Sequence, residues 1–274
     1  MNTMTKETTG RPTTQYLGRG SDQIAYDVQG DGRLVVAVPG MGDLRGTYRF
    51  LVPALVAAGF RVATVDLRGH GQSGVDFDRF DDVAAASDVV ALIEHLGGPA
   101  NIIGNSMGAG VAVIAAADRP DLVDRLVLTG PFVRDVPTPP GMSIAMRVAL
   151  LRPWGPRVWR TFHRKMFATR VPGDYAAYRD DLMATLTRPG AWKALQQTTR
   201  TSHRPAEERL DRVRAKTLVV MGGSDPDFKD PAAEAELVAD RLGGRVVLVP
   251  DAGHYPQAEF PEVVGPVVAE FLKA

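Results

Sequence analysis

The sequence predicts an α/β protein: a mostly parallel sheet with helices on both faces and an inserted helical segment. Two features of the 274 residues support this fold class. Short runs made only of aliphatic residues recur along the chain, which is typical of strands that are buried on both faces of a sheet. Segments long enough for helices separate these runs, as in chains that wind back and forth across a parallel sheet. The hydrophobic fraction of 45% is sufficient for a large core.

The expected elements follow in chain order. A hairpin comes first, over residues 14–17 and 23–28, with glycines at positions 18, 20 and 30 as turn residues. Buried strands are then expected at residues 34–38, 61–65, 100–103, 125–128, 217–221 and 246–249. Helices are expected at residues 48–58, 80–96, 109–118, 231–242 and 261–272.

The regular alternation of strands and helices is interrupted once. It stops at Gly130-Pro131 and resumes at Thr217, and the segment between is rich in proline, methionine and aromatic residues. This composition indicates several helices inserted into an otherwise regular fold. We therefore expect the first part of an α/β core at residues 1–132, a helical lid at 133–208 and the second part of the core at 209–274.

Composition excludes several classes of function. The chain has 32 basic and 32 acidic side chains, so it offers no overall attraction to nucleic acid or to an anionic membrane. Residues 1–15 are polar and do not resemble a signal peptide, and no stretch approaches the roughly 20 apolar residues of a membrane span. We expect a cytoplasmic protein. Because cysteine is absent, disulfides, thiolate nucleophiles and cysteine-based metal sites are excluded.

A serine motif lies between an expected strand and an expected helix. The motif is Gly104-Asn105-Ser106-Met107-Gly108, a G-x-S-x-G pattern. At such a junction the serine lies on a sharp turn that exposes its hydroxyl above the sheet edge, and Gly104 and Gly108 let strand and helix pass closely. The pattern predicts that Ser106 is a nucleophile, with a base, an acid and an oxyanion site elsewhere in the chain.

A serine hydroxyl is a weak nucleophile at neutral pH and needs an adjacent base, usually histidine. His254 follows the last expected strand, in the sequence Asp251-Ala252-Gly253-His254, from which it can reach back over the sheet edge. We expect His254 to be this base. We expect the other four histidines to be solvated or packed residues without a catalytic role: His70, His95, His163 and His203.

The carboxylate that orients the histidine is expected in a loop between the serine and the histidine. Asp225 lies three residues beyond a strong strand, and Pro226 stiffens the turn behind it. Two alternatives remain: Asp227 in the same turn, and Asp135 after the strand that follows the nucleophile helix. The position of Asp225 directly after its strand favours Asp225.

Acyl transfer passes through an alkoxide that backbone N–H groups must stabilise. Met107, the residue after the expected nucleophile, is one expected donor. Met41 is the other, because Gly40 and Gly42 on either side let the backbone of that loop approach a substrate closely. An ordinary glycine-rich turn between strand and helix is the alternative interpretation of this loop.

Together these motifs resemble those of the α/β-hydrolases. The resemblance covers nearly the whole chain, from Pro39-Gly40-Met41-Gly42 through Asp66-Leu67-Arg68-Gly69-His70-Gly71-Gln72-Ser73 to Asp225 and His254. It implies an eight-stranded, mostly parallel sheet, a triad completed by Ser106, and an insert that acts as a lid. It also implies a serine hydrolase that cleaves a carboxylic ester or related acyl bond through an acyl-enzyme, without a metal ion or cofactor. One departure is the proline of the first motif, where many relatives carry a histidine that braces the oxyanion loop.

Other functions are compatible with parts of the sequence. The serine motif is similar to that of carbon–carbon bond hydrolases of ring-cleavage products, although Ala109 and Tyr255 stand where those usually have glycine and tryptophan. Cofactor-free, haloperoxidase-like perhydrolases share the same triad, and a slow-turnover ligand receptor can be built on the same fold. A dinucleotide site at residues 38–46, with Asp66 as ribose ligand, is disfavoured, because its glycine spacing differs from the fingerprint and leaves the triad unexplained.

The expected lid has an asymmetric charge. Residues 136–173 contain no acidic residue and seven basic ones, namely Arg147, Arg152, Arg157, Arg160, Arg164, Lys165 and Arg170. These side chains form either a solvated outer face, paired with the acidic run at residues 76–82, or a positive rim that steers anionic substrates. The methionine and aromatic residues are expected to adapt to a small-molecule substrate of apolar or anionic character. None of the motifs specifies an oligomeric state.

Overall fold

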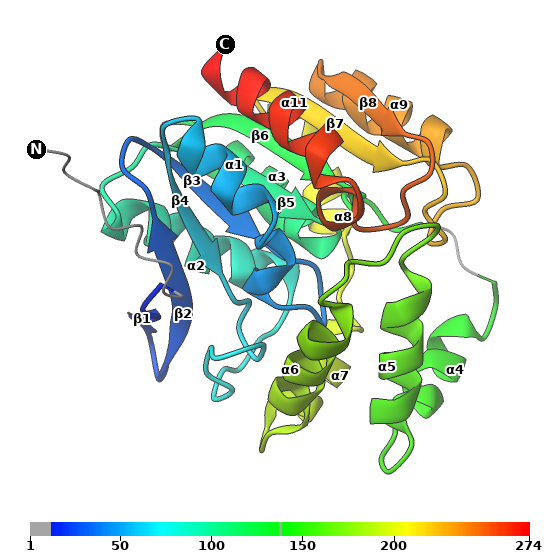
Figure 1. The fold of residues 1–274 in the computed structure, drawn as a ribbon. Helices are drawn as coiled ribbons and strands as arrows, with labels where there is room; N and C mark the ends of the chain where they lie inside the picture. The colour runs from blue at the N-terminus through cyan, green and yellow to red at the C-terminus, as the bar shows by residue number, and fades with distance from the viewer. Residues whose placement is uncertain (1–11, 137–138) are drawn as a thin grey trace, which may run out of the picture.

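A computed structural model describes residues 12–136 and 139–274 of the chain (Figure 1). The expected eight-stranded, mostly parallel sheet is confirmed: its strand order is β1-β2-β4-β3-β5-β6-β7-β8. β2 runs antiparallel to both β1 and β4, and every other neighbouring pair is parallel. The strands are β1 Gln15–Arg19, β2 Asp22–Gln29, β3 Arg33–Val38, β4 Phe60–Val65, β5 Ala100–Asn105, β6 Val123–Thr129, β7 Lys216–Gly222 and β8 Arg245–Val249.

Helices connect the strands and fill the inserted segment. The helices of the sheet layers are α1 Leu51–Ala57, α2 Asp82–His95, α3 Met107–Asp118, α9 Pro231–Leu242, α10 Pro256–Glu259 and α11 Pro261–Lys273. Between β6 and β7 lie α4 Met142–Ala149, α5 Gly155–Lys165, α6 Tyr175–Thr187, α7 Ala191–Thr198 and α8 Arg204–Glu207. Two short 3-10 turns are η1 Arg45–Tyr48 and η2 Leu210–Arg212. Across the two described ranges, no helix is both long enough and apolar enough to cross a bilayer.

The sheet separates two apolar cores, because successive side chains of a strand point to opposite faces. In β3, Val36 and Val38 belong to the core that α2, α3 and α9 cover, whereas Val35 and Ala37 belong to the core under α1 and α11. This is the arrangement that continuous aliphatic strands require. Figure 1 shows α1 and α11 side by side over one face of the sheet.

Most element boundaries differ from the sequence prediction by no more than a few residues, and the differences at α1 and α3 have identifiable local causes. Helix α3 begins at Met107, so it follows Ser106 directly without a connecting turn. The helix expected from Tyr48 is divided: η1 ends at Tyr48, and α1 begins at Leu51 with Pro53 in its first turn, where the missing N–H of proline is tolerated. The polar segment predicted at residues 1–15 lies largely outside the described residues, which begin at Pro12.

The helical insert, here defined as residues 133–208 within the described ranges, has an apolar core of its own. Trp159, Leu182, Trp192 and Leu195 pack together away from the two sheet cores. Figure 1 shows α4 to α7 projecting together from the sheet domain, on the side opposite α11. The last helix of the insert, α8, differs, because its Ala206 packs within the main sheet core.

Candidate active site

Ser106 lies on a strained turn between β5 and α3. Its φ of 56° makes it the one non-glycine residue with a positive φ among residues 12–136 and 139–274. Such a conformation costs about 1–3 kcal/mol and persists only where the surroundings impose it. A Cβ on Gly104 would lie 2.3 Å from the carbonyl oxygen of Gly108, and a Cβ on Gly108 would lie 2.3 Å from that of Val38. Both glycines of the motif are therefore required by the close passage of strand and helix.

The loop after β8 brings His254 against Asp225. Nδ1 of His254 lies 2.7 Å from Oδ2 of Asp225, and both side chains are buried. The backbone around His254 is held from two sides: its N–H donates to the carbonyl of Met166 in the insert at 2.8 Å, and its carbonyl accepts from the side chain of Asn105 at 3.1 Å. The carboxylate of Glu259 accepts the N–H of Gly253, the residue before His254, at 2.8 Å. The imidazole is thus fixed by both the core and the insert.

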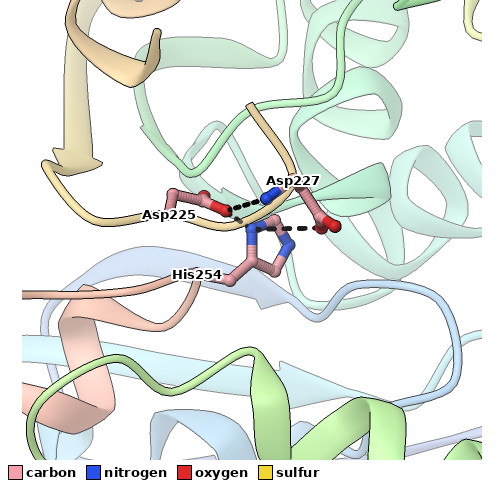
Figure 2. Close-up of side chains that lie close together, drawn as sticks. All are labelled: Asp225, Asp227 and His254. Carbon is pink, nitrogen blue, oxygen red and sulfur yellow. Dashed lines mark hydrogen bonds and ion pairs between the residues drawn. The ribbon is translucent and has the colours of Figure 1, made fainter. Parts of the chain in front are cut away.

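The structure distinguishes the three carboxylates considered from the sequence. Figure 2 shows the side chains of Asp225 and Asp227 both approaching Nδ1 of the His254 ring. Oδ2 of Asp227 is 3.7 Å from Nδ1, and the N–H of Asp227 donates to Asp225 at 3.0 Å, so Asp227 supports the nearer carboxylate. Asp135 lies elsewhere: its oxygens accept from the hydroxyl of Ser202 and the N–H of His203.

The charges around His254 set its pKa. Burial disfavours the imidazolium and lowers the pKa, but the charge and hydrogen bond of Asp225, together with Asp227 and Asp43, outweigh burial and raise the pKa from 6.5 to about 9. Burial raises the pKa of the neighbouring Asp227 carboxyl from its ordinary value. The carboxylates thus stabilise the imidazolium that forms when a histidine takes a proton from a serine.

Asp225, Asp227 and His254 also form the one group of potential metal ligands in the part of the chain that the structure describes, with donor atoms within 4.8 Å of one another. A histidine ligates a metal through an unprotonated ring nitrogen. Nδ1 of His254, the nitrogen nearest both carboxylates, is engaged with Asp225. Hydrogen bonding therefore accounts for the proximity of these three residues.

The two expected oxyanion donors come from different elements, the loop after β3 and the start of α3. Met107 is the first residue of α3, so its N–H has no acceptor within the helix. Met41 follows Gly40, at which a Cβ would lie 2.8 Å from Cβ of Ser106. Only glycine lets this loop pass so close to the serine. The loop is also tied to the insert, because the indole of Trp159 donates to the carbonyl oxygen of Gly42 at 3.1 Å.

Ser106, His254 and Met41 line one pocket of about 180 Å³ between the core and the insert. Its wall is mainly apolar. The insert and the neighbouring loops contribute Phe132, Met146, Trp159, Phe162, Met166 and Tyr255. Four of the methionine and aromatic residues of the insert, Met146, Trp159, Phe162 and Met166, thus line the pocket beside Ser106, whereas others such as Met142 and Trp154 are exposed outside it.

Two histidines that the sequence did not single out also line this pocket, His163 and His203. The ring of His163 stacks on Tyr175, and its Nε2 lies 3.6 Å from the buried carboxylate of Asp43. Burial acts to raise the pKa of Asp43, but the nearby imidazole of His163 and the hydrogen bond from the hydroxyl of Tyr178 leave it below its ordinary value. The aromatic-rich insert was the one sequence signal for these residues, since no spacing connects them to the triad.

The remaining histidines and the Asp66 loop have structural contacts. His95 bonds the hydroxyl of Tyr26 at 3.1 Å, and His70 is buried with Nδ1 2.9 Å from the carbonyl of Arg68. Asp66 is buried and forms an ion pair with Arg45. This engagement leaves Asp66 unsuited to bind a ribose, so the dinucleotide interpretation has no support.

The seven basic residues between positions 136 and 173 are exposed. Arg160 pairs with Asp180 at 3.5 Å, and Arg170 pairs with Glu262. Among the described ion pairs, the acidic run at residues 76–82 is joined to the insert through His203 and not through these basic side chains. The expected pairing of these basic residues with the acidic run is therefore wrong. Helix α5 presents its apolar side to the pocket and its arginines to the solvent.

Comparisons with known proteins agree with this architecture. The family model for serine aminopeptidase, S33, matches residues 25–258. Pimeloyl-[acyl-carrier protein] methyl ester esterase of Neisseria meningitidis is 31% identical over 247 residues, which cover 87% of this chain and 92% of that protein. Putative non-heme bromoperoxidase BpoC of Mycobacterium tuberculosis is 30% identical over 271 residues, covering 91% and 97%.

Solved structures share the fold. A bromoperoxidase from Bacillus anthracis superposes with a TM-score of 0.84 at 21% identity, covering 96% of this chain and 100% of that one. The family model spans most of the chain, and its match includes the segments that carry Ser106, Asp225 and His254. The chain therefore belongs to the α/β-hydrolases, within the family described as serine aminopeptidase, S33, and it is an enzyme of this class.

Proposed function

We propose that the protein is a serine hydrolase that cleaves a carboxylic ester or related acyl bond through an acyl-enzyme. The observation that supports this most directly is the 2.7 Å contact between Nδ1 of His254 and Asp225, in the pocket that Ser106 also lines. A carboxylate that accepts the Nδ1 proton leaves Nε2 as the basic nitrogen. The methyl ester esterase among the relatives supports the same type of reaction.

In the proposed reaction, Oγ of Ser106 attacks the acyl carbon and its proton passes to Nε2 of His254. The alkoxide that forms accepts hydrogen bonds from the N–H groups of Met41 and Met107. When the alkoxide collapses, the bond to the leaving alcohol breaks and the alcohol takes the proton from His254. Water then attacks the acyl-enzyme with His254 again as base, which releases the acid and regenerates Ser106.

We further propose that residues 133–208 act as a lid between the two parts of the core, 1–132 and 209–274. Trp159 and Phe162 of α5 line the pocket, and Met166 binds the backbone of His254, so the insert contributes both to the pocket and to the position of the base. The apolar wall suits a small-molecule substrate with an apolar part, and the exposed arginines suit an anionic one. We expect the enzyme to act in the cytoplasm.

One alternative chemistry has a specific observation in its favour. The similarity to BpoC, which is named as a putative non-heme bromoperoxidase, favours perhydrolysis, in which hydrogen peroxide replaces water at the acyl-enzyme. Carbon–carbon bond hydrolysis is less favoured, because Tyr255 stands beside His254 where that subfamily usually has tryptophan. Both alternatives require the same nucleophile.

A fluorophosphonate probe tests the proposal, since it reacts covalently with activated serines. We expect the wild-type protein to be labelled and Ser106→Ala to remain unlabelled, with Ser87→Ala, a substitution on the outer side of α2, labelled normally. The wild type should also hydrolyse p-nitrophenyl esters, tested over increasing acyl length. Absence of labelling at Ser106 would overturn the acyl-enzyme mechanism, whereas labelling without ester turnover would favour a slow-turnover receptor.

A further inference from the structure

A second buried histidine–carboxylate pair lines the same pocket as the proposed triad. Nδ1 of His203 lies 2.7 Å from Oδ2 of Asp82, and both side chains are almost fully buried. The hydroxyl of Thr201 donates to the other oxygen of Asp82 at 3.2 Å. Asp82 is also the first residue of α2, where the helix dipole stabilises a negative charge. The carboxylate is therefore well placed to accept the Nδ1 proton of His203.

One aromatic ring lies next to both histidines. The centroid of the Phe132 ring is 5.6 Å from that of His203 and 5.9 Å from that of His254. All three rings line the pocket. A substrate whose acyl carbon lies at Ser106 would therefore extend past Phe132 toward His203.

The second ring nitrogen of His203 is available to a ligand. With Nδ1 bound to Asp82, Nε2 is the remaining polar atom of the side chain, and it has no hydrogen-bond partner within residues 12–136 and 139–274. Nε2 accepts a hydrogen bond when the ring is neutral and donates one when it is protonated. In both states an oxygen atom of a substrate can be its partner.

Anchoring of the chain does not by itself explain the pair. The same segment is already held to the core by Asp135, which accepts from the hydroxyl of Ser202 at 2.6 Å and from the backbone N–H of His203 at 2.7 Å. These two bonds do not involve the imidazole. An apolar side chain at position 203 would meet the same anchoring need and would suit a pocket for a purely apolar substrate.

We propose that His203, oriented by Asp82, determines specificity by binding a second oxygen of the substrate, separate from the ester that is cleaved. The inference rests on the proposed esterase function and narrows its substrate class. The preferred substrates are esters that carry a further hydroxyl, ketone or carboxylate group, and simple alkyl esters of the same length are poorer. Phe132 sets the distance between the two polar sites.

Matched p-nitrophenyl esters test this proposal. The four acyl groups have the same length: pentanoate, 3-hydroxypentanoate, 4-oxopentanoate and the monoester of glutarate. We expect the wild type to prefer at least one oxygenated ester over pentanoate. His203→Leu should lower kcat/KM for that ester by about 10- to 100-fold, mainly through KM, because one hydrogen bond to substrate is lost. Its kcat/KM for pentanoate should stay within about threefold.

Two further variants separate binding from structure. His203→Gln, whose amide can reach the position of Nε2, should recover part of the preference, and His95→Gln, an exposed histidine far from the pocket, should leave all four rates unchanged. Wild-type protein that does not favour any oxygenated ester would overturn the proposal. An equal loss for all four esters in His203→Leu would also overturn it, because that is the result of a merely structural role.

A binding measurement separates this inference from the proposed function. In Ser106→Ala protein, the imidazole proton signals of His203, assigned by their loss in His203→Gln, are followed by NMR during titration with the four free acids. We expect the oxygenated acids to shift these signals at lower concentration than pentanoic acid. Such shifts support binding at His203 even if no ester is hydrolysed. If esters are hydrolysed but the His203 signals do not respond to the oxygenated acids, the proposed role of His203 is wrong and the esterase function stands.

Discussion

The indole of Trp159 donates its Nε1–H to the carbonyl oxygen of Gly42, at 3.1 Å, and so joins helix α5 of the insert to the loop that carries Met41. The two groups are in close contact, because a Cβ on Gly42 would lie 2.0 Å from the indole ring. The φ of +67° at Gly42 also favours glycine at this position. The insert therefore braces one of the two proposed oxyanion donors. A proline precedes this loop where relatives often carry a bracing histidine, and Trp159 supplies a brace from the opposite side.

Trp159→Phe should lower kcat for p-nitrophenyl esters by about 3- to 10-fold, because the lost hydrogen bond, worth about 0.5–1.5 kcal/mol, leaves the Met41 loop less constrained. The matched control is Trp192→Phe, since Trp192 is equally buried in the insert and donates to the carbonyl of Leu150 at 3.0 Å. Both variants should lose similar stability in urea unfolding. Equal kcat values in the two variants would contradict the coupling.

Asp225→Asn should lower kcat by about a thousandfold or more, because an amide cannot stabilise the imidazolium and favours the wrong tautomer of His254. Asp227→Asn should cost less than about tenfold, since its carboxylate is 3.7 Å from Nδ1 and has no hydrogen bond to it. Steady-state kinetics on one p-nitrophenyl ester compares the two. A larger loss in Asp227→Asn would reassign the acid of the triad.

The pH dependence of kcat/KM should have an acid limb with a midpoint above pH 6.5. His254 acts as base only when neutral, and nearby carboxylates, against the effect of burial, raise its pKa from 6.5 to about 9. Activity is therefore lost as the pH falls through this raised pKa. Asp227→Asn removes one of the charges that raise the pKa, so its midpoint should move to lower pH. A midpoint at or below 6.5 in the wild type would contradict the electrostatic description.

Gly40→Ala should lower kcat/KM by about a hundredfold, because small displacements of reacting groups have effects of this size. The new Cβ would lie 2.8 Å from Cβ of Ser106 and would force the loop or the serine to move. Gly18→Ala is the control, since no atom lies within 4 Å of a Cβ at that position. Fluorophosphonate labelling rates and ester kinetics of both variants give the result. Wild-type kinetics in Gly40→Ala would show that the loop does not constrain the nucleophile.

Charge reversal on the insert tests electrostatic steering. Arg160→Glu with Arg164→Glu should lower the ratio of kcat/KM for an anionic ester to that for a neutral ester by about threefold or more at low salt, and the difference should shrink at high salt. Arg214→Glu with Lys216→Glu makes the same change of charge at the amino end of β7, away from the pocket. If the ratio is unchanged in Arg160→Glu with Arg164→Glu, these arginines do not steer the substrate and form only a solvated surface.

The fold was largely predictable because its signals are local. Buried strands such as β3 and β7 are built around continuous apolar runs, and each lies within one residue of its predicted bounds. The boundary errors occur where local rules compete: α1 starts late because Pro53 belongs in a first turn, and α3 starts early because the turn at Ser106 feeds directly into the helix. These are differences of a few residues at element ends, where hydrogen bonds are incomplete.

The sequence by itself determined the order of strands and helices and singled out Ser106, because the strand–serine–helix turn is specified by five adjacent residues. The sequence favoured Asp225 over Asp227, because Asp225 lies nearer the end of its strand, but both residues stand in the same turn. Only the tertiary structure shows how near each carboxylate comes to Nδ1 of His254, 2.7 Å for Asp225 and 3.7 Å for Asp227. It also decided the pairing of His203 with Asp82 across 121 positions of sequence. Periodicity and motifs record contacts between near neighbours in the chain, whereas these pairings depend on how the insert packs against the sheet.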